Sequence, residues 1–326
     1  MLIIQILLGG ITRLTGSGLS ITQWGPILGA LPPFNETAWK KSFALYQHIA
    51  QFKKLNSNFT LADYKSIFFW EWLHREWARL MGLVFLIPFG IFIFRRMIGK
   101  ELVVPLALLF ISGALQGVIG WIMVKTGLND SDISVSHISL AIHFIFALLL
   151  LCYVFWFLLS LTIKPGHIPV PAALRKQNIL LLVMLTVQLI YGAFMAGTHA
   201  GLYAPTWPKI NGSFLPVNWG NNIPHDLFYS PLIIQFIHRC MAFFILITLI
   251  IWYIGIWGVK RGSTLRHWRS LPIILVFAQV TLGVFALLHS GMPDAIYFSI
   301  LHQFVGILLL LSLVATLYLG RTSFTS

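Results

Sequence analysis

The stretch EWLHREWARLMGLVFLIPFGIFIF, residues 71–94, combines two features that rarely occur together. Its first half carries two glutamates, two arginines and a histidine, whereas its second half has no charged residue. An apolar run of this length is typical of a helix that crosses the roughly 30 Å of hydrocarbon in a membrane. Ionisable side chains inside such helices are rare and are functional candidates by default. The stretch therefore predicts a membrane helix with a polar site near one end.

The composition extends this prediction to the whole chain of 326 residues. Hydrophobic residues make up 58% of it and charged residues only 10%, whereas a soluble domain has about 25% charged residues. The predicted fold class is an all-α polytopic membrane protein, because a membrane β-barrel needs alternating strands of about ten residues instead of continuous apolar runs. We expect eight spans, at 1–11, 66–94, 101–124, 135–163, 177–197, 231–258, 270–289 and 297–319.

The first predicted span, residues 1–11, has about half the length that a membrane crossing needs. It also lacks the basic region and cleavage site of a signal peptide. We therefore expect a first helix that is short or truncated, through a misplaced start or through residues missing before Met1.

The net charge of +13 is interpreted as a topology signal. Ten of the 22 basic residues lie in three short connections, 95–100, 164–176 and 259–269, which together with Arg321 fall on one side of the predicted bundle. That side is cytoplasmic by the positive-inside rule. Eight of the nine acidic residues fall on the other side, the exception being Glu101. No nucleic-acid partner is expected. In the connections 164–176 and 259–269 the basic residues are Lys164, Arg175, Lys176, Lys260, Arg261, Arg266 and Arg269.

An internal repeat predicts two parallel four-helix halves, residues 1–165 and 166–326. Odd-numbered spans share a Gln-x-x-x-Gly element and even-numbered spans each carry one histidine near their start, with 159 to 183 positions between corresponding residues. We interpret the Gln–Gly element as a packing element, with a ligand contact as the alternative. The pairs are Gln5/Gly9, Gln116/Gly120, Gln188/Gly192 and Gln279/Gly283. The histidines are His74, His143, His238 and His302.

These four histidines are predicted to lie at one depth near the outer face, paired His74 with His143 and His238 with His302. Two imidazoles that face each other across a bundle can supply both axial ligands of a haem iron. Zinc fits less well, since each half offers only two such nitrogens and no nearby thiolate. For a single histidine, an interhelical hydrogen bond is the alternative. The two cysteines lie inside apolar spans and are interpreted as packing residues.

Three arginines adjoin the candidate ligands. Arg75 and Arg239 each follow a histidine, where they could bind haem propionates or extend toward lipid headgroups. Arg79 lies deeper in its helix, with Glu76 three residues before it as a plausible partner.

Glu71 lies one turn before His74 and is the candidate catalytic residue. A carboxylate there could accept a proton or stabilise developing charge, or it could simply face the aqueous boundary. The corresponding residue before His238 is Gln235. This difference predicts that one half reacts while the other holds a permanent cofactor.

The segments between the spans carry recognisable helix signals. Residues 38–54 are predicted to form one amphipathic surface helix. Thr60 is predicted to cap the second span together with Asp63, and Pro231 to begin the sixth.

Several stretches resemble the haem A synthase family over nearly the whole chain, and the likeness is to the type without outer-loop cysteine pairs. They are GGITRLTGSGLSITQW (9–24), EWLHREWARLMG (71–82), VSHISLAIHF (135–144), AGLYAPTWPKI (200–210), QFIHR (235–239) and LHQFVG (301–306).

The resemblance implies eight spans in two pseudo-symmetric halves and an oxidoreductase that converts the C8 methyl of haem O into the formyl group of haem A. It implies haem b between His238 and His302, substrate haem between His74 and His143, and Glu71 as the functional carboxylate. One departure is Ser139, where the family usually has arginine, and it concerns the propionate contacts.

The resemblance also implies partners: haem O synthase, a terminal oxidase as recipient of haem A, and an electron acceptor that the sequence does not identify. Together with the charge pattern it places the protein in the bacterial inner membrane, among lipid, with the haem sites near the periplasmic face. Homo-oligomerisation is left open. A non-catalytic di-haem b cytochrome or haem carrier is the alternative function.

Overall fold

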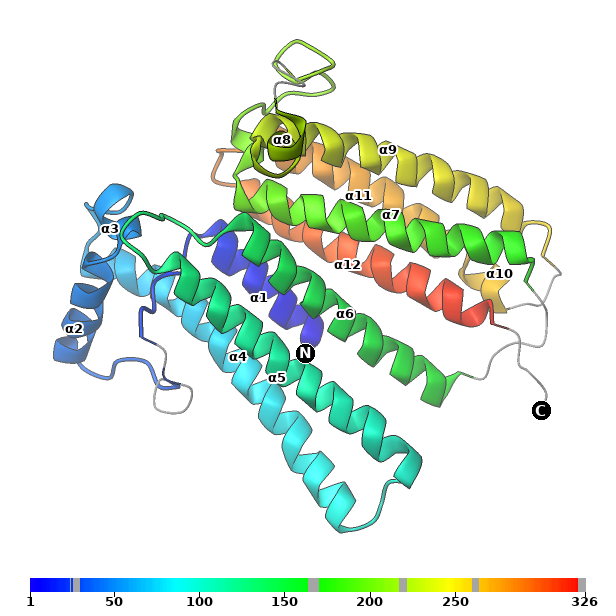
Figure 1. Ribbon diagram of the computed structural model, residues 1–326, viewed down its shortest axis with the longest axis horizontal. Coiled ribbons are helices and arrows are strands. Elements are labelled where there is room, and N and C mark those ends of the chain that lie inside the picture. Colours follow the sequence, from blue (N-terminus) through cyan, green and yellow to red (C-terminus); the bar gives the residue numbers. More distant parts are fainter. Residues whose placement is uncertain (24, 26–29, 164–169, 217–221, 260–263, 322–326) are drawn as a thin grey trace. The chain divides into compact units, whose positions relative to one another are not determined.

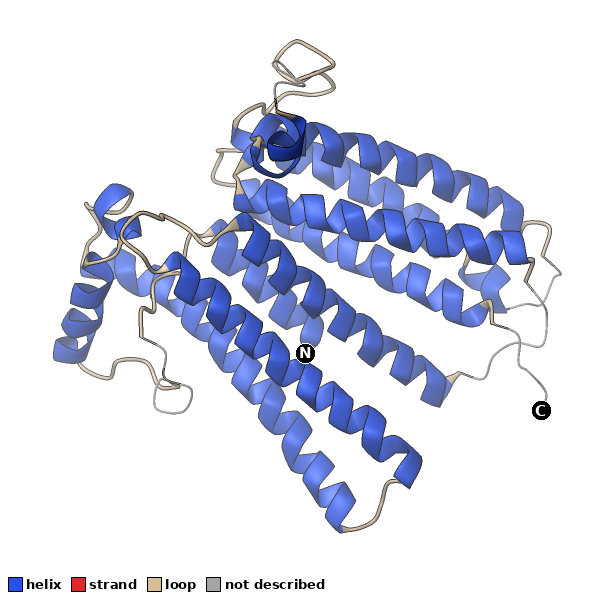
Figure 2. Cartoon of the chain, viewed as in Figure 1, coloured by secondary structure: helices blue, strands red, loops and turns tan. Residues whose placement is uncertain are grey.

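The computed structural model describes the chain except residues 24, 26–29, 164–169, 217–221, 260–263 and 322–326. The described part is helical, and its one β-bridge is isolated, between Ile210 and Ser213 (Figure 2). Its helices are α1 (Leu2–Leu14), α2 (Glu36–Gln47), α3 (Ala50–Lys54), α4 (Leu61–Phe94), α5 (Lys100–Gly127), α6 (His137–Thr162), α7 (Ala172–Gly197), η1 (Ala200–Leu202), α8 (Ile223–Tyr229), α9 (Pro231–Ile256), α10 (Thr264–Trp268), α11 (Ser270–Leu288) and α12 (Ala295–Leu319).

In the part of the chain that the structure describes, seven helical segments are long and apolar enough to cross a membrane: α4, α5, α6, α7, α9, α11 with the residues just before it, and α12. The shorter apolar helix α1 has 13 residues. The predicted all-α membrane fold is thus confirmed, with a short first helix, and the protein is an integral membrane protein. Four residues used in the sequence argument, Trp24, Lys164, Lys260 and Arg261, lie outside the described ranges.

Local signals set two of the helix starts as predicted. The Thr60 hydroxyl accepts a hydrogen bond from the backbone N–H of Asp63, and the Asp63 carboxylate accepts one from the backbone N–H of Thr60, at 2.8 Å. This reciprocal capping box satisfies two backbone donors that the first turn of α4 leaves open. Pro231 is the first residue of α9, where its missing N–H costs no helical hydrogen bond.

The predicted single helix over 38–54 is wrong: it is two helices, α2 and α3, separated at His48 and Ile49. The break allows the chain to turn back, so that the Tyr46 hydroxyl donates to the Gln51 side-chain oxygen at 3.0 Å. Tyr46 is fully buried against Tyr64 and Phe68 of α4. A continuous helix would direct its later apolar residues away from this cluster.

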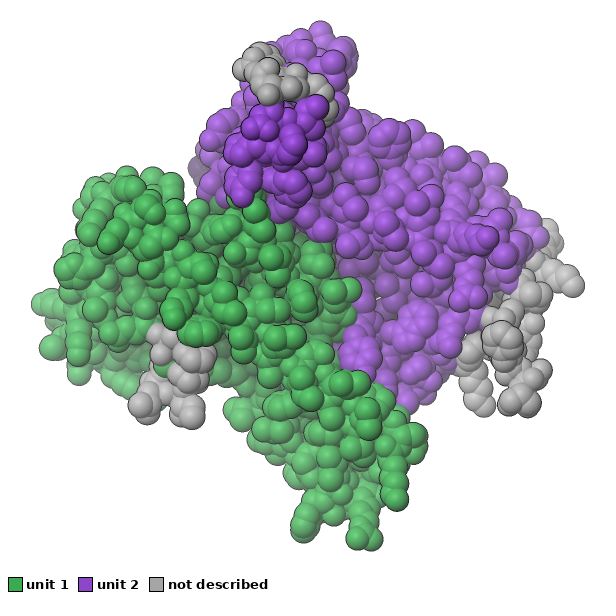
Figure 3. Space-filling model, viewed as in Figure 1, with its two compact units in different colours: residues 1–150 green, residues 151–326 purple. Residues whose placement is uncertain are grey.

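The chain forms two compact units, residues 1–150 and 151–326 (Figure 3). In the second unit α7, α9, α11 and α12 pack side by side as a four-helix bundle (Figure 1). In the first unit α1 packs on α4, and α4 on α5. The division falls inside α6, and the predicted halves 1–165 and 166–326 stay a prediction.

Candidate functional site

The second unit brings His238 of α9 and His302 of α12 together. Their ring centres are 6.3 Å apart and their planes are inclined at 66°. Metal–imidazole bonds are about 2 Å long, so two axial ligands of one iron place their ring centres roughly 6 Å apart. The spacing of this pair therefore fits a haem iron held by both rings.

The hydrogen bonds of His302 favour the form that binds a metal. Its Nδ1 lies 3.0 Å from the main-chain oxygen of Gln279, which can only accept, so Nδ1 carries the proton. Nε2 then keeps its lone pair, as a metal ligand requires. The side-chain nitrogen of Gln279 lies 3.2 Å from that Nε2.

His238 has an equivalent neighbour in α7. The side-chain nitrogen of Gln188 lies 3.2 Å from His238 Nε2. His238 Nδ1 is buried and has no hydrogen-bond partner among the described residues. The uncommitted nitrogen of His238 is therefore Nδ1, whereas Nε2 faces Gln188.

In the first unit, glutamines also contact His74 of α4 and His143 of α6. The amide nitrogen of Gln5 lies 3.4 Å from His74 Nε2 and donates to the His74 carbonyl at 3.1 Å. The amide nitrogen of Gln116 lies 3.2 Å from His143 Nδ1 and donates to the His143 carbonyl at 2.9 Å.

The glycine of each Gln-x-x-x-Gly element lies against the same histidine as its glutamine. A Cβ atom built on Gly9 or Gly120 would lie 3.1 or 2.8 Å from the Cε1 atom of His74 or His143. On Gly192 or Gly283 it would lie 3.4 or 2.9 Å from that of His238 or His302. The sequence interpretation expected contacts between helices from these residues, but it did not identify the histidines as the partners. The signal was in the pattern, since each element directly precedes a histidine-bearing span.

Glu71 is buried, with 3% of its surface exposed, so it does not face the aqueous boundary. One carboxylate oxygen accepts from the Ser20 hydroxyl at 2.7 Å and from the Ile21 N–H at 2.8 Å. The other pairs with Arg75, which also donates to the Ile21 carbonyl at 3.2 Å. Glu71 and Arg75 therefore attach the loop after α1 to α4.

The remaining predicted arginines also contact backbone carbonyls of loops. Arg79 pairs with Glu76, as predicted, and donates to the Gly25 carbonyl at 3.0 Å. Arg239 donates to the carbonyls of Thr206 at 2.8 Å and Ala204 at 3.3 Å, in the loop after α7. Arginines at these places organise the loops that border the histidine sites.

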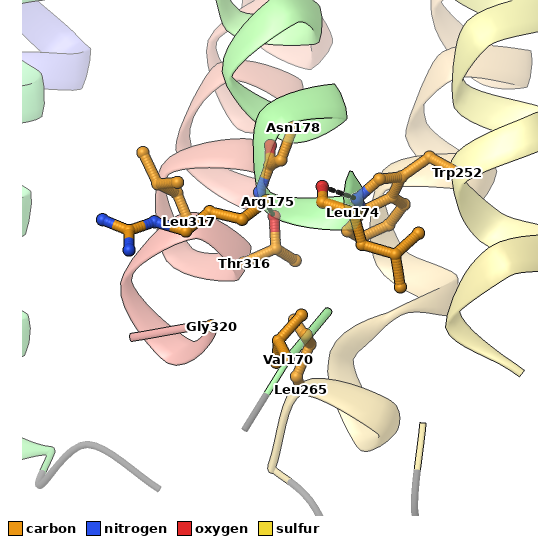
Figure 4. Close-up of a pocket in the computed structure, with 9 residues that line it drawn as sticks. All are labelled: Val170, Leu174, Arg175, Asn178, Trp252, Leu265, Thr316, Leu317 and Gly320. Atoms are coloured by element: carbon orange, nitrogen blue, oxygen red, sulfur yellow. Dashed lines mark hydrogen bonds between the residues drawn. The ribbon is translucent and has the colours of Figure 1, made fainter. Parts of the chain in front are cut away.

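A small pocket in the second unit has no histidine among the residues that line it (Figure 4). It includes Asn178, which precedes Gln188 in α7 by about three turns. Its cavity of about 10 Å³ has room for one water molecule. It is far too small for a haem, and the candidate site remains with the histidines.

The fold defines an all-α integral membrane protein whose helices carry partly buried histidines near one another. Within that class, the chain belongs to the cytochrome oxidase assembly protein family, whose model matches residues 1–314. The family resemblance seen in the sequence is thereby confirmed.

Proteins named haem A synthase are similar over most of their length. The protein from Granulibacter bethesdensis is 38% identical, with 99% of this chain and 86% of that protein covered. The protein from Maricaulis maris is 39% identical over 97% of this chain and 92% of its own. That from Flavobacterium psychrophilum is 36% identical, with 97% and 93% covered.

Proposed function

We propose that this protein is a haem A synthase, which oxidises the C8 methyl group of haem O to the formyl group of haem A. The balanced conversion consumes the methyl group and one water, and releases four protons and four electrons. Family membership and the names of the similar proteins support the reaction. The observation that carries it is the pair of histidine sites, of which only one adjoins a buried carboxylate among the described residues.

The two sites take different roles in this proposal. His74 and His143 bind the substrate haem beside Glu71, and His238 and His302 hold a resident haem b. When bound there, haem b would supply one-electron chemistry. The 6.3 Å spacing of the His238 and His302 rings supports the resident site.

The chain's own residues prepare the reacting site. Glu71 and Arg75 fasten the loop after α1 over the first turns of α4, which restricts water at the His74 side. Three donors engage the Glu71 carboxylate, and they favour its acting as a fixed negative charge rather than as a free proton acceptor. A fixed charge can stabilise positive charge that develops on the substrate. We propose Glu71 as the catalytic residue in this sense.

Arg75, Arg79 and Arg239 are proposed to border the haem propionates. Their guanidinium groups already bind loop carbonyls, so each would contact a propionate with its remaining N–H groups or by exchanging partners. Their placement one or a few residues after His74 and His238 supports this role.

The proposed setting is the bacterial inner membrane, with the histidine sites near the periplasmic face. Haem O synthase would supply the substrate, and a terminal oxidase would receive haem A. The description of the family as oxidase assembly proteins supports this place in haem delivery.

The direct test is co-expression with a haem O synthase, followed by haem extraction and chromatography. Wild type should produce haem A, and Glu71→Gln should produce about 100-fold less while it keeps its resident haem. The matched control is Gln235→Glu, which places a carboxylate at the corresponding position of the other half. This variant should form no more haem A than wild type does. A wild-type protein that binds haem yet forms no haem A would establish the alternative, a haem carrier or cytochrome.

A further inference from the structure

Two arginines contact one tryptophan at the end of the second unit where α9 ends and α11 begins (Figure 1). The guanidinium carbon of Arg269 lies 3.7 Å from the centre of the Trp257 ring, and that of Arg266 lies 5.8 Å from it. In such cation–π contacts the face of the ring attracts the positive charge. Trp257 is 53% exposed, so a molecule from outside the bundle can reach the cluster.

This cluster lies far from the histidines. Trp257 directly follows α9 and comes 19 residues after His238, which corresponds to a rise of about 28 Å along the helix. The charge pattern of the sequence predicts that this end of the bundle faces the cytoplasm. The cluster is therefore separate from the proposed haem sites.

The cluster holds positive charge that its surroundings leave uncompensated. The Nη1 atom of Arg269 is buried and has no hydrogen-bond partner among the described residues. A buried donor without an acceptor destabilises the fold, and more so when it belongs to a charged group. Like charges three residues apart also repel each other, as Arg266 and Arg269 do. Of the nine acidic residues only Glu101 is predicted on this side of the membrane, and it belongs to the first unit.

The arginines of the cluster are held in place. Arg266 donates from Nη1 to the carbonyl of Val259 at 2.8 Å, and Arg269 also lies 5.9 Å from the centre of the Tyr253 ring. Two guanidinium groups fixed on either one or two neighbouring rings form a preorganised site, in which little side-chain freedom is lost when a ligand binds.

Basic residues that only set the topology need no such contacts, because the positive-inside rule depends on charge alone. In the first unit Arg95 and Arg96 follow α4 and are exposed. Among the described residues on the predicted cytoplasmic side, the cation–π contacts belong to Arg266, Arg269 and Arg321, all in the second unit. The stacked arginines therefore require an explanation beyond topology.

We propose that Arg266, Arg269 and Trp257 form a binding site for the phosphate group of an anionic membrane phospholipid. A phosphate supplies the acceptor oxygens that planar guanidinium groups engage in pairs. A lipid is the source because Trp257 lies at the end of a membrane-crossing helix, at the level where tryptophans meet lipid headgroups. Ile254 and Ile274 are exposed in the same two helices, toward their centres, where acyl chains can cover them.

The test measures lipid binding by native mass spectrometry, and thermal unfolding, of the purified protein in detergent. The added probes are phosphatidylglycerol, phosphatidylcholine and inorganic phosphate. Wild type should retain phosphatidylglycerol and gain thermal stability from it, but not from the other two. Arg269→Gln should weaken this binding about five-fold, the usual effect of one basic residue at an anionic membrane surface. Arg95→Gln is the matched control and should bind as wild type does.

Two further variants distinguish a built site from diffuse charge. Arg269→Lys keeps the charge but loses the planar fork and the stacking on the ring, so it should weaken binding as Arg269→Gln does. Trp257→Leu removes the exposed ring without opening the core and should also weaken binding. It provides an independent answer if the arginine variants fail to fold.

The proposal would be overturned by equal retention of the two lipids in wild type, or by an Arg269→Lys protein that binds like wild type. Stabilisation by inorganic phosphate as large as that by phosphatidylglycerol would assign the cluster to a soluble anion and exclude the lipid. None of these measurements needs bound haem, so their results are independent of the proposed function.

Discussion

The loops after α1 and after α7 are attached to their neighbouring helices at corresponding positions, but with opposite polarity. In the first unit Glu71 accepts hydrogen bonds from Ile21 N–H and the Ser20 hydroxyl. In the second, Gln235 donates to the Ala204 carbonyl at 3.0 Å. Ile21 and Ala204 are 183 positions apart, the same separation as Gln5 and Gln188.

The comparison shows that the difference between Glu71 and Gln235 affects loop attachment as well as the proposed chemistry. The sequence alone suggests that the first half gained a carboxylate for chemistry. The structure adds that this carboxylate also holds a loop, through an ion pair with Arg75 that the second unit does not need. Arg239 reaches its loop carbonyls directly. One residue thus combines a structural and a proposed chemical task, and experiments must separate the two.

The largest expected effect is a difference between the two histidine pairs in haem binding. In protein purified without haem O, His238→Ala should lose the low-spin b-type spectrum completely, because one axial ligand is gone. His74→Ala should keep it, since its site binds substrate. Optical difference spectra of the two purified variants give the answer. Equal loss in both would contradict the assignment of the resident haem to the second unit.

The next effect concerns the attachment of the loops. Glu71→Ala leaves the partly buried Arg75 without its carboxylate partner and the Ser20 and Ile21 donors without their acceptor, and should lower the free energy of unfolding by about 3 kcal/mol. Gln235→Ala removes one neutral hydrogen bond and should cost about 1–3 kcal/mol. Thermal or denaturant unfolding in detergent measures both. Equal losses would mean that the ion pair contributes no more than the neutral contact.

A smaller effect is expected at the arginine of the second unit. Arg239→Met keeps the apolar part of the side chain but leaves the carbonyls of Ala204 and Thr206 without this donor. The free energy of unfolding should fall by about 1–3 kcal/mol, and limited proteolysis should cut the loop after α7 sooner. An unchanged cleavage rate would show that other contacts hold this loop.

The smallest effect tests a feature of the first unit, the aromatic cluster between α2, α3 and α4. Tyr46→Phe removes a hydroxyl that donates to Gln51 and accepts from Asn56 at 2.7 Å. We expect a loss of about 1 kcal/mol, without any change in the spectrum of the resident haem. A spectral change would mean that this cluster influences the second unit after all.

The sequence by itself determined the membrane helices and the candidate ligands of this protein. Span length and apolar content are local properties, so 66–94 and 231–258 could be located without knowledge of their neighbours. The repeat then indicated which histidines correspond. The capping of α4 by Thr60 and Asp63 was equally readable, because both partners lie within one turn.

Only the tertiary structure decided what the polar side chains contact. Gln5 and His74 are 69 positions apart, and Glu71 and Ile21 are 50 positions apart. Nothing in local spacing fixes such pairs, since they depend on how one helix is rotated against another. The break between α2 and α3 follows from the same cause, because burial of Tyr46 against α4 outweighs the tendency of 38–54 to form one helix. The ring contacts of the Gln-x-x-x-Gly elements became visible only once the helices were packed.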